Sequence, residues 1–282
     1  MNDGALSYYR VLDLLHQSLN PRTYVEIGVR EGDSACLALD VTTVIAVDPC
    51  ARILRPLAAG AIVERCTSDD FFASGRISQH LSGRPIDLAF IDGMHLWEFA
   101  LRDFLNIERS AHPGTVVLLH DCLPPGAVEA QRQRSTNVWT GDVWKLLYYL
   151  REERPDLEVT VLDARPTGLG VIRNLDPSRA LPDLEEAWRK YGSLSFDTFE
   201  TDLLPTLRVV KGDWSAMRDV FPVDPWQNRG SVAELRAQRD RRHTPPAMRL
   251  RQAKRRLGKS ALGPVLKKVR RTLVGSAKTN QP

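Results

Sequence analysis

The sequence predicts an α/β fold with a Rossmann-like, doubly wound sheet, and three observations support this prediction. Short apolar runs alternate with segments of helical spacing, as a parallel sheet requires. The first apolar run leads into a loop from Gly28 to Gly32, and glycine can adopt backbone angles that other residues avoid. The second run ends at Asp48, 20 residues after Gly28, which is the spacing typical of an acid that binds ribose hydroxyls.

The first elements of the chain surround this loop. Residues 5–19 repeat apolar positions at helical spacing, so we expect a lid or packing helix that Pro21 ends. Strands are expected at 23–27 and 44–47, and Ser34 suits the start of a helix between them. The pattern indicates a ligand-binding loop, and a tight turn without a ligand is the alternative.

The following segments extend the sheet. Strands are expected at 61–64, 86–91 and 115–119, and helices are expected over 68–80 and 96–109. Each strand is therefore separated from the next by a crossover segment, which makes all five strands parallel.

The chain changes character after the fifth strand. Residues 122–140 are rich in Pro, Arg, Gln and Thr and predict a long loop of the kind that often contacts substrates. A helix over 142–151 follows, and the runs 157–162 and 168–173 predict an antiparallel hairpin. Five parallel strands and a C-terminal hairpin predict a seven-stranded sheet.

Charge divides the chain into parts. We expect a sheet domain over 1–175, an extension packed on it over 176–230, and a basic tail over 231–282 that is partly helical or disordered. The tail carries 15 Lys and Arg against two acids, whereas the other 230 residues carry 24 basic and 33 acidic side chains. We expect the tail to contact an anionic membrane surface, another polyanion or an acidic partner, and a solubilising tail is the alternative.

Composition indicates a globular protein with a full core, since 43% of its 282 residues are hydrophobic and 26% are charged. No apolar run approaches the ~18 residues of a membrane span, and the first residues lack the basic start of a secretory signal. We therefore expect a cytoplasmic protein, peripheral at the inner membrane face if the tail binds lipid. The four cysteines lack Cys-x-x-Cys spacing, which favours reduced thiols. The oligomeric state stays open, a homo-oligomer included.

Acidic residues close the fourth and fifth strands at Asp92 and Asp121. Neighbouring strands lie ~4.8 Å apart, so the two carboxylates are expected to face each other. Two close carboxylates repel unless one is protonated or a cation lies between them, and Mg²⁺ prefers such oxygen ligands. The alternative is that Asp121 only caps the following loop.

Two histidines accompany these acids. His95 lies three residues after Asp92, across a turn opened by Gly93, and a neutral imidazole is a suitable general base near neutral pH. His120 precedes Asp121 and is expected to support the metal ligands or to compete as a base. A structural role is the alternative for His95.

Three motifs and the first loop resemble a known family. The motifs are Phe-Ile-Asp-Gly-Met-His at 90–95, Val-Leu-Leu-His-Asp-Cys at 117–122 and Thr-Ser-Asp-Asp-Phe-Phe at 67–72, and the loop reads Glu-x-Gly-x-x-x-Gly from Glu26. Together they resemble class I S-adenosylmethionine (SAM) methyltransferases, in particular a bacterial group related to the metal-dependent sugar O-methyltransferases of macrolide biosynthesis. The resemblance covers residues 20–175 and leaves the tail outside.

The resemblance implies roles for individual residues. Glu26 and Gly28 would meet the methionine end of SAM, and Ser68 and Asp69 would meet its adenine. The loop adds Gly32 and Ser34, and the acid at the end of the second strand adds Asp48. The expected SAM-binding residues are therefore Glu26, Gly28, Gly32, Ser34, Asp48, Ser68 and Asp69.

The resemblance also implies the chemistry at the fourth and fifth strands. The aspartate of an Asp-Gly-x-His turn ligates Mg²⁺ in that group and its histidine is the base, which places these roles on Asp92 and His95. An acidic pair closes the fifth strand there, whereas this chain has His120 and Asp121, so an imidazole replaces one carboxylate. The expected metal ligands are Asp92, Asp121 and His120, and the expected acceptor is a hydroxyl of a sugar or glycoside.

Other functions stay open. The acceptor could be a phenol or another small metabolite, and a non-catalytic SAM-fold protein could dock through its tail. A nucleic-acid methyltransferase would explain the basic tail, but the first lysine of the chain is Lys145, which argues against the Lys-Asp-Lys-Glu type. The glycine pattern argues against a nucleotide-dependent dehydrogenase.

Overall fold

The structure is a computed structural model that describes residues 5–217, 220–221 and 232–243. Its contacts divide the chain into two units, Met1–Arg239 and Asp240–Pro282. Most of the predicted basic tail lies outside the described residues, and none of the described helices is long and apolar enough to cross a membrane.

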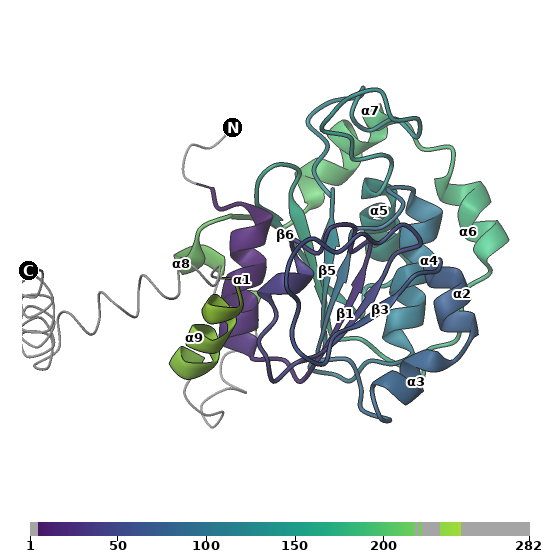
Figure 1. Ribbon diagram of the computed structural model, residues 1–282. Coiled ribbons are helices and arrows are strands. Elements are labelled where there is room, and N and C mark those ends of the chain that lie inside the picture. The colour runs from purple at the N-terminus through teal and green to yellow at the C-terminus, as the bar shows by residue number, and fades with distance from the viewer. Residues whose placement is uncertain (1–4, 218–219, 222–231, 244–282) are drawn as a thin grey trace, which may run out of the picture. The chain divides into compact units, whose positions relative to one another are not determined.

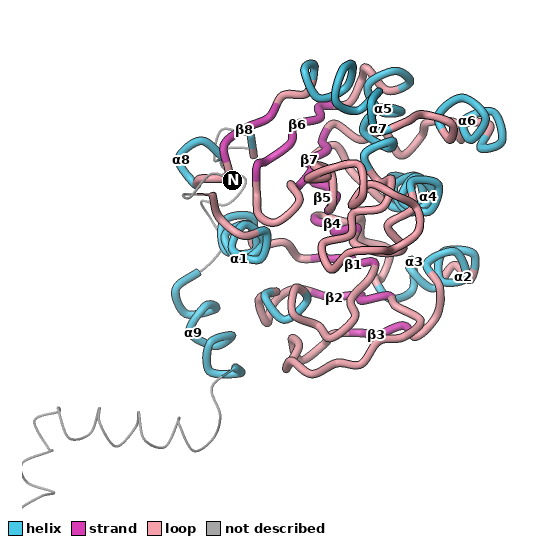
Figure 2. Tube along the Cα trace, turned by 90° about the horizontal axis from the view of Figure 1, so that it is seen from above, coloured by secondary structure: helices cyan, strands magenta, loops and turns pink. Residues whose placement is uncertain are grey.

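One sheet forms the centre of the first unit, in the strand order β3-β2-β1-β4-β5-β7-β6-β8 (Figure 2). Its strands are β1 (Thr23–Ile27), β2 (Thr43–Val47), β3 (Ile62–Glu64), β4 (Leu88–Ile91), β5 (Val116–His120), β6 (Glu158–Asp163), β7 (Leu169–Arg173) and β8 (Val209–Lys211). Strands β1 to β5 pair in parallel, β7 is antiparallel to both β5 and β6, and β8 is parallel to β6. This is a Rossmann-like α/β arrangement with a mostly parallel sheet.

The predicted count of seven strands is wrong, because the described residues form a sheet of eight. The additional strand, β8, comes from the region predicted as an extension and pairs Val209 with Val161 of β6. The hairpin of β6 and β7 therefore lies inside the sheet and not at its edge, and a three-residue strand satisfies the backbone groups that would otherwise face solvent there.

Helices cover both faces of the sheet (Figures 1 and 2). They are α1 (Tyr8–Leu19), α2 (Ser68–Ala73), α3 (Arg76–His80), α4 (Trp97–Glu108), α5 (Trp144–Glu153), α6 (Leu184–Tyr191), α7 (Phe196–Thr198), α8 (Trp214–Met217) and α9 (Val232–His243), with shorter turns at Ala35–Leu37, Phe199–Leu203 and Leu204–Thr206. Successive strand residues point to opposite faces, so Val25 and Ile27 pack into the core beneath α4 and α5, whereas Tyr24 packs into the core beneath α1.

The helix expected after Gly32 is only one 3₁₀ turn, Ala35–Leu37. The residues that follow, from Val41 to Val44, are β-branched and favour extended backbone, which leaves little chain for a helix before β2.

The predicted tail begins inside the first unit. Arg239 of α9 is buried, and its guanidinium donates to the carboxylate of Asp13 in α1 and to the carbonyl of Leu37. These contacts join α9 to α1 and to the turn that follows Ser34.

Candidate active site at the strand ends

The polar residues predicted for the site follow strands that lie side by side. β1 pairs with β2 and β4, and β4 pairs with β5, all in parallel. Their carboxyl ends therefore meet at one edge of the sheet, where open α/β sheets bind ligands. The site has two sides, one at β1 and β2 and the other at β4 and β5.

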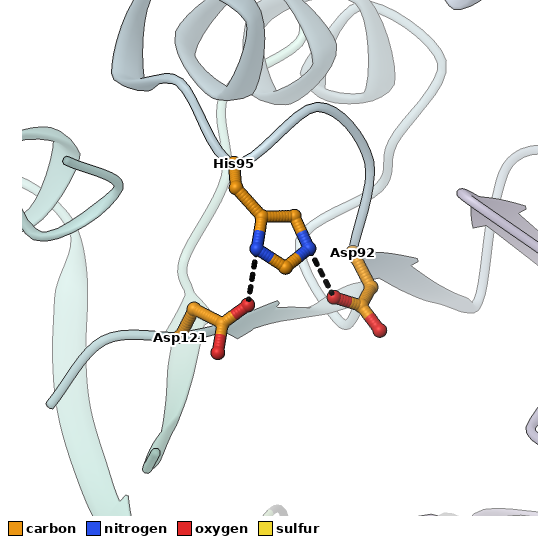
Figure 3. Close-up of side chains that lie close together, drawn as sticks. All are labelled: Asp92, His95 and Asp121. Carbon is orange, nitrogen blue, oxygen red and sulfur yellow. Dashed lines mark ion pairs between the residues drawn. The ribbon is translucent and has the colours of Figure 1, made fainter. Parts of the chain in front are cut away.

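The β4–β5 side brings Asp92, His95 and Asp121 together (Figure 3). The His95 ring lies between the two carboxylates, with its Nε2 3.4 Å from Asp92 Oδ1 and its Nδ1 3.0 Å from Asp121 Oδ2. One donor atom from each of the three residues lies within 4.8 Å of the others. The two acids therefore converge, as the strand order predicts.

The backbone at this side is strained. His95 has a φ of 54° and Asp121 a φ of 61°, both in the left-handed region that non-glycine residues rarely adopt. Such conformations cost about 1–3 kcal/mol each and persist where the surroundings enforce them, often at functional sites.

A carbonyl group orients the His95 ring. Nδ1 lies 2.9 Å from the carbonyl oxygen of Trp139, whose indole also stacks on the imidazole at 5.0 Å between ring centroids. Because a carbonyl only accepts hydrogen bonds, Nδ1 carries the hydrogen in this contact. Nε2, which faces Asp92, is therefore the nitrogen that can accept a proton.

His120 lies on the other side of the acids. Its Nδ1 is 3.1 Å from Asp92 Oδ1 and 3.3 Å from Asp121 Oδ2, and Tyr8 of α1 packs on its ring at 4.1 Å between centroids. The Thr167 hydroxyl donates to Asp121 Oδ1 at 2.6 Å. His120 is an ion-pair partner of both acids and lies outside the group of three donors.

The charges of these four groups depend on one another. Burial opposes a charged His120, but the carboxylates of Asp92 and Asp121 raise its pKa to about 10. Burial also opposes a charged His95, and the same two carboxylates raise its pKa above the ordinary value. Burial opposes ionisation of Asp92, but the two imidazoles hold its pKa well below the usual range. The two carboxylates therefore favour the protonated form of both imidazoles.

The donor set also fits a hard cation. Asp121 Oδ2 is buried and has no hydrogen-bond partner among the described residues, although it lies within ion-pair distance of both imidazoles. A cavity of about 10 Å³, enough for about one water molecule, is lined by residues that include Asp92, His95 and Asp121. An unsatisfied carboxylate oxygen beside a cavity of this size suits a Mg²⁺ ligand.

The β1–β2 side has a fully buried acid. Both oxygens of Glu26 accept hydrogen bonds, one from the Tyr24 hydroxyl at 2.7 Å and one from the Ser34 hydroxyl at 2.5 Å. Burial raises the pKa of Glu26 to about 8, although both hydroxyls oppose this shift. Both carboxyl oxygens of Glu26 are therefore engaged by side chains of the protein.

Asp48 and the glycines shape the loop. Asp48 is half-buried and accepts from the backbone amides of Arg30 at 2.8 Å and Cys50 at 2.7 Å, one on each oxygen. Each oxygen keeps a lone pair that a ribose hydroxyl could use, so Asp48 fits the predicted role. Gly28 has a φ of 89°, and a Cβ there would lie 2.0 Å from the carbonyl oxygen of Asp92. Its small size therefore allows the close contact between the end of β1 and the end of β4.

The predicted adenine contacts lie at the start of α2. Asp69 is held by Arg102 of α4 through two hydrogen bonds of 2.9 and 2.8 Å. Burial raises the pKa of the Asp103 carboxyl in α4 to about 7, and the nearby Ser68 hydroxyl opposes this rise. Ser68 and Asp69 therefore both contact α4, the helix that follows His95.

Three residues in contact with the site were not predicted from the sequence: Tyr8, Trp139 and Thr167. Trp139 lies in the loop that composition indicated as a substrate loop, which was the only available signal. Tyr8 reaches His120 because backbone hydrogen bonds with Arg165 tie the start of α1 to the β6–β7 turn, and Thr167 lies in that same turn.

Comparison with known proteins finds similarity in the first half of the chain. Residues 25–122, about a third of the chain, match a family described as a methyltransferase domain. This part of the chain is therefore similar to a methyltransferase domain, and the match ends directly after Asp121. No curated protein matches the chain.

Several solved structures are similar to part of the chain. Cofactor-bound Rv0187 from MTB is 21% identical, with a TM-score of 0.48 over 62% of this chain and 83% of that chain. The O-methyltransferase TomG from Streptomyces achromogenes, solved with SAM, is 18% identical, with a TM-score of 0.47 over 62% and 84%. An O-methyltransferase from Bacillus cereus, solved with SAH, is 19% identical, with a TM-score of 0.45 over 59% and 80%.

Proposed function

We propose that the protein is a SAM-dependent O-methyltransferase that methylates a hydroxyl group with the help of a divalent cation. The convergence of Asp92, His95 and Asp121 at the ends of β4 and β5, with one oxygen of Asp121 unsatisfied, is the observation that carries this proposal. The match to the methyltransferase domain family covers residues 25–122, which include all three residues, and supports the proposal.

The proposed donor site lies at the β1–β2 side. SAM would supply the methyl group on its sulfonium. Asp48 would accept hydrogen bonds from the ribose hydroxyls, and Glu26 would hold Ser34 in place from below. The residues of this proposed site are Glu26, Gly28, Gly32, Ser34, Asp48, Ser68 and Asp69.

The proposed acceptor side is at β4 and β5. Asp92 and Asp121 would hold Mg²⁺, and the bound cation would lower the pKa of the acceptor hydroxyl. His95 would take the hydroxyl proton on Nε2, since Trp139 holds the hydrogen on Nδ1. Asp121, 3.0 Å from Nδ1, would then stabilise the imidazolium. We propose that His120, predicted as a ligand, acts instead as a positive counter-charge for the two acids.

A sugar hydroxyl is our first choice of acceptor, in keeping with the resemblance of residues 90–95 to sugar O-methyltransferases, and a phenol is the second. The test is methyl transfer from radiolabelled SAM to panels of glycosides and phenols, with Mg²⁺ or with excess chelator. We expect turnover that chelator abolishes and Mg²⁺ restores. Full activity in chelator would remove the cation from the mechanism, and SAM binding without transfer to any acceptor would favour a non-catalytic role.

We further propose that the basic tail contacts an anionic surface, such as the inner face of the cytoplasmic membrane, in a cytoplasmic protein. Residues 231–282 carry 15 basic side chains, which attract anionic lipids in a salt-dependent way. Co-sedimentation of the full chain should occur with vesicles that contain anionic lipid and weaken as salt rises. Equal binding to neutral vesicles would contradict this proposal.

A further inference from the structure

The segment Trp139–Asp142, defined here as the 139–142 segment, meets His95 at several points. The carbonyl of Trp139 accepts from the His95 ring, and its indole covers one ring face. A Cβ on Gly141 would lie 1.7 Å from the His95 carbonyl oxygen, so the two backbones are in direct contact. The segment therefore contacts the ring and the main chain of the residue proposed as the base.

Asp142 completes these contacts at the start of α4. The residue before this helix, Leu96, provides no side-chain cap, and the Trp97 amide donates instead to Asp142 Oδ1 at 3.1 Å. An acid at this position satisfies one of the free amides of the first turn and favours the helix dipole. The cap comes from 45 residues along the chain, so it fixes the end of the His95 turn to the 139–142 segment.

The 139–142 segment is itself held firmly. Asp142 is 2% exposed, and its second oxygen accepts from Arg132 at 2.8 Å and lies 3.2 Å from the ammonium of Lys145. The carbonyl of Glu129 accepts from the amides of Thr140 and Gly141 at 3.0 and 3.1 Å. These contacts can supply the constraint that the left-handed backbone of His95 requires.

We propose that Asp142 and Gly141 are positioning residues that hold His95 in its strained conformation, with Nε2 toward Asp92. Gly141 allows its backbone to approach the His95 carbonyl, which a side chain at position 141 would prevent. Asp142 accepts a hydrogen bond from the amide of Trp97, two residues after His95. The catalytic role of this positioning rests on the proposed function, but the position of His95 can be measured without turnover.

A matched pair of glycine variants isolates the contact. Gly141 has a φ of 58° and Gly75 a φ of 69°, so alanine adds similar backbone strain at either position, but nothing lies within 4 Å of a Cβ on Gly75. Gly141→Ala should therefore displace His95, whereas Gly75→Ala should not. Asp142→Ala should act like Gly141→Ala, and Asp142→Asn should act more weakly because it keeps an oxygen for the Trp97 amide.

The experiment records ¹⁵N–¹H spectra of the imidazoles in the full chain, with His95 assigned from His95→Gln, together with Mn²⁺ and S-adenosylhomocysteine affinities. Gly141→Ala and Asp142→Ala should shift the His95 signals, expose its Nδ1 hydrogen to exchange and weaken Mn²⁺ binding at least about tenfold. S-adenosylhomocysteine affinity should stay within about threefold of wild type.

Unchanged His95 signals in folded Gly141→Ala or Asp142→Ala, or equal shifts in Gly75→Ala, would overturn the proposal. If Asp142→Ala does not fold, Asp142→Asn and Gly141→Ala decide the question. If wild type binds no Mn²⁺, the metal part of the proposed function fails, while the His95 spectra still decide the positioning role.

Discussion

Acids at the ends of β1 and β2 receive their hydrogen bonds from fixed donors, whereas acids at the ends of β4 and β5 face imidazoles. Glu26 binds two hydroxyls and Asp48 binds two backbone amides. Asp92 and Asp121 lie within 3.4 Å of histidine nitrogens, and one oxygen of Asp121 has no hydrogen bond among the described residues. The acids of the β1–β2 side are held in place by the protein. On the β4–β5 side, a cation could replace the imidazole protons as the positive partner of the two carboxylates.

Left-handed backbone outside glycine occurs on both sides, but it falls on different kinds of residue. On the β4–β5 side it falls on His95 and Asp121 themselves, whereas on the β1–β2 side it falls on Arg30, whose amide donates to Asp48. Strain and unsatisfied polar atoms concentrate where a protein is shaped for a ligand and not for stability alone. The β4–β5 side combines left-handed backbone at His95 and Asp121 with an unsatisfied carboxylate oxygen, and it is therefore our candidate for the reaction site.

The largest expected effect is on turnover at the β4–β5 side. His95→Ala and Asp92→Ala should each lower kcat at least about 10²-fold, because they remove the proposed base and a cation ligand, while SAM affinity stays within a few-fold. The control is Asp48→Asn, which should weaken SAM binding and leave metal dependence in place. Wild-type kcat in His95→Ala would remove His95 as the base.

Glu26→Gln tests the supporting role of the β1–β2 side. The folded pKa of Glu26, about 8, lies above the 4.5 of the free side chain, so the protein stabilises the protonated form. Wild-type stability from this group is thus full below pH 4.5 and is lost as pH rises towards 8. As pH rises from 5 to 7, wild type should lose about 2 kcal/mol of unfolding free energy from this group, and Glu26→Gln should not. Denaturant titrations at both pH values measure this, and a difference that does not depend on pH would contradict the assignment.

His16→Leu tests the layer beneath the same side. His16 is fully buried against Tyr24, its ring nitrogens have no hydrogen-bond partner among the described residues, and burial lowers its pKa to about 3. Because the unfolded chain binds this proton more strongly, stability falls as pH drops below the ordinary value of 6.5. Wild type should lose about 2 kcal/mol from this group between pH 7 and pH 5, and His16→Leu should not. Equal acid sensitivity of the two proteins in thermal unfolding would show that His16 is not the cause.

Sequence reasoning found the β4–β5 acids because strand ends are predictable. Asp92 and Asp121 each end an apolar run, and parallel neighbours place such ends together. The eighth strand was missed since β8 is only three residues long, in a region without periodicity. Contacts made by Tyr8, Trp139 and Thr167 depend on how distant loops fold back, which no local pattern reports.

Glu26 shows a different limit. Its place before Gly28 predicts a ligand contact, which stays a prediction. The alternation of β1 directs its side chain into the protein beneath α1, where it accepts from Tyr24 and Ser34. Local pattern identified an unusual acid, and only the packing of α1 on the sheet shows what surrounds it.

Mn²⁺ binding tests the central claim most directly, because Mn²⁺ occupies Mg²⁺ sites and can be followed by electron paramagnetic resonance. Wild type and Glu26→Gln should bind one Mn²⁺ with the same affinity, and Asp121→Asn should bind it at least about tenfold more weakly. Absence of binding in wild type, or equal affinity in Asp121→Asn, would contradict a cation site at the ends of β4 and β5.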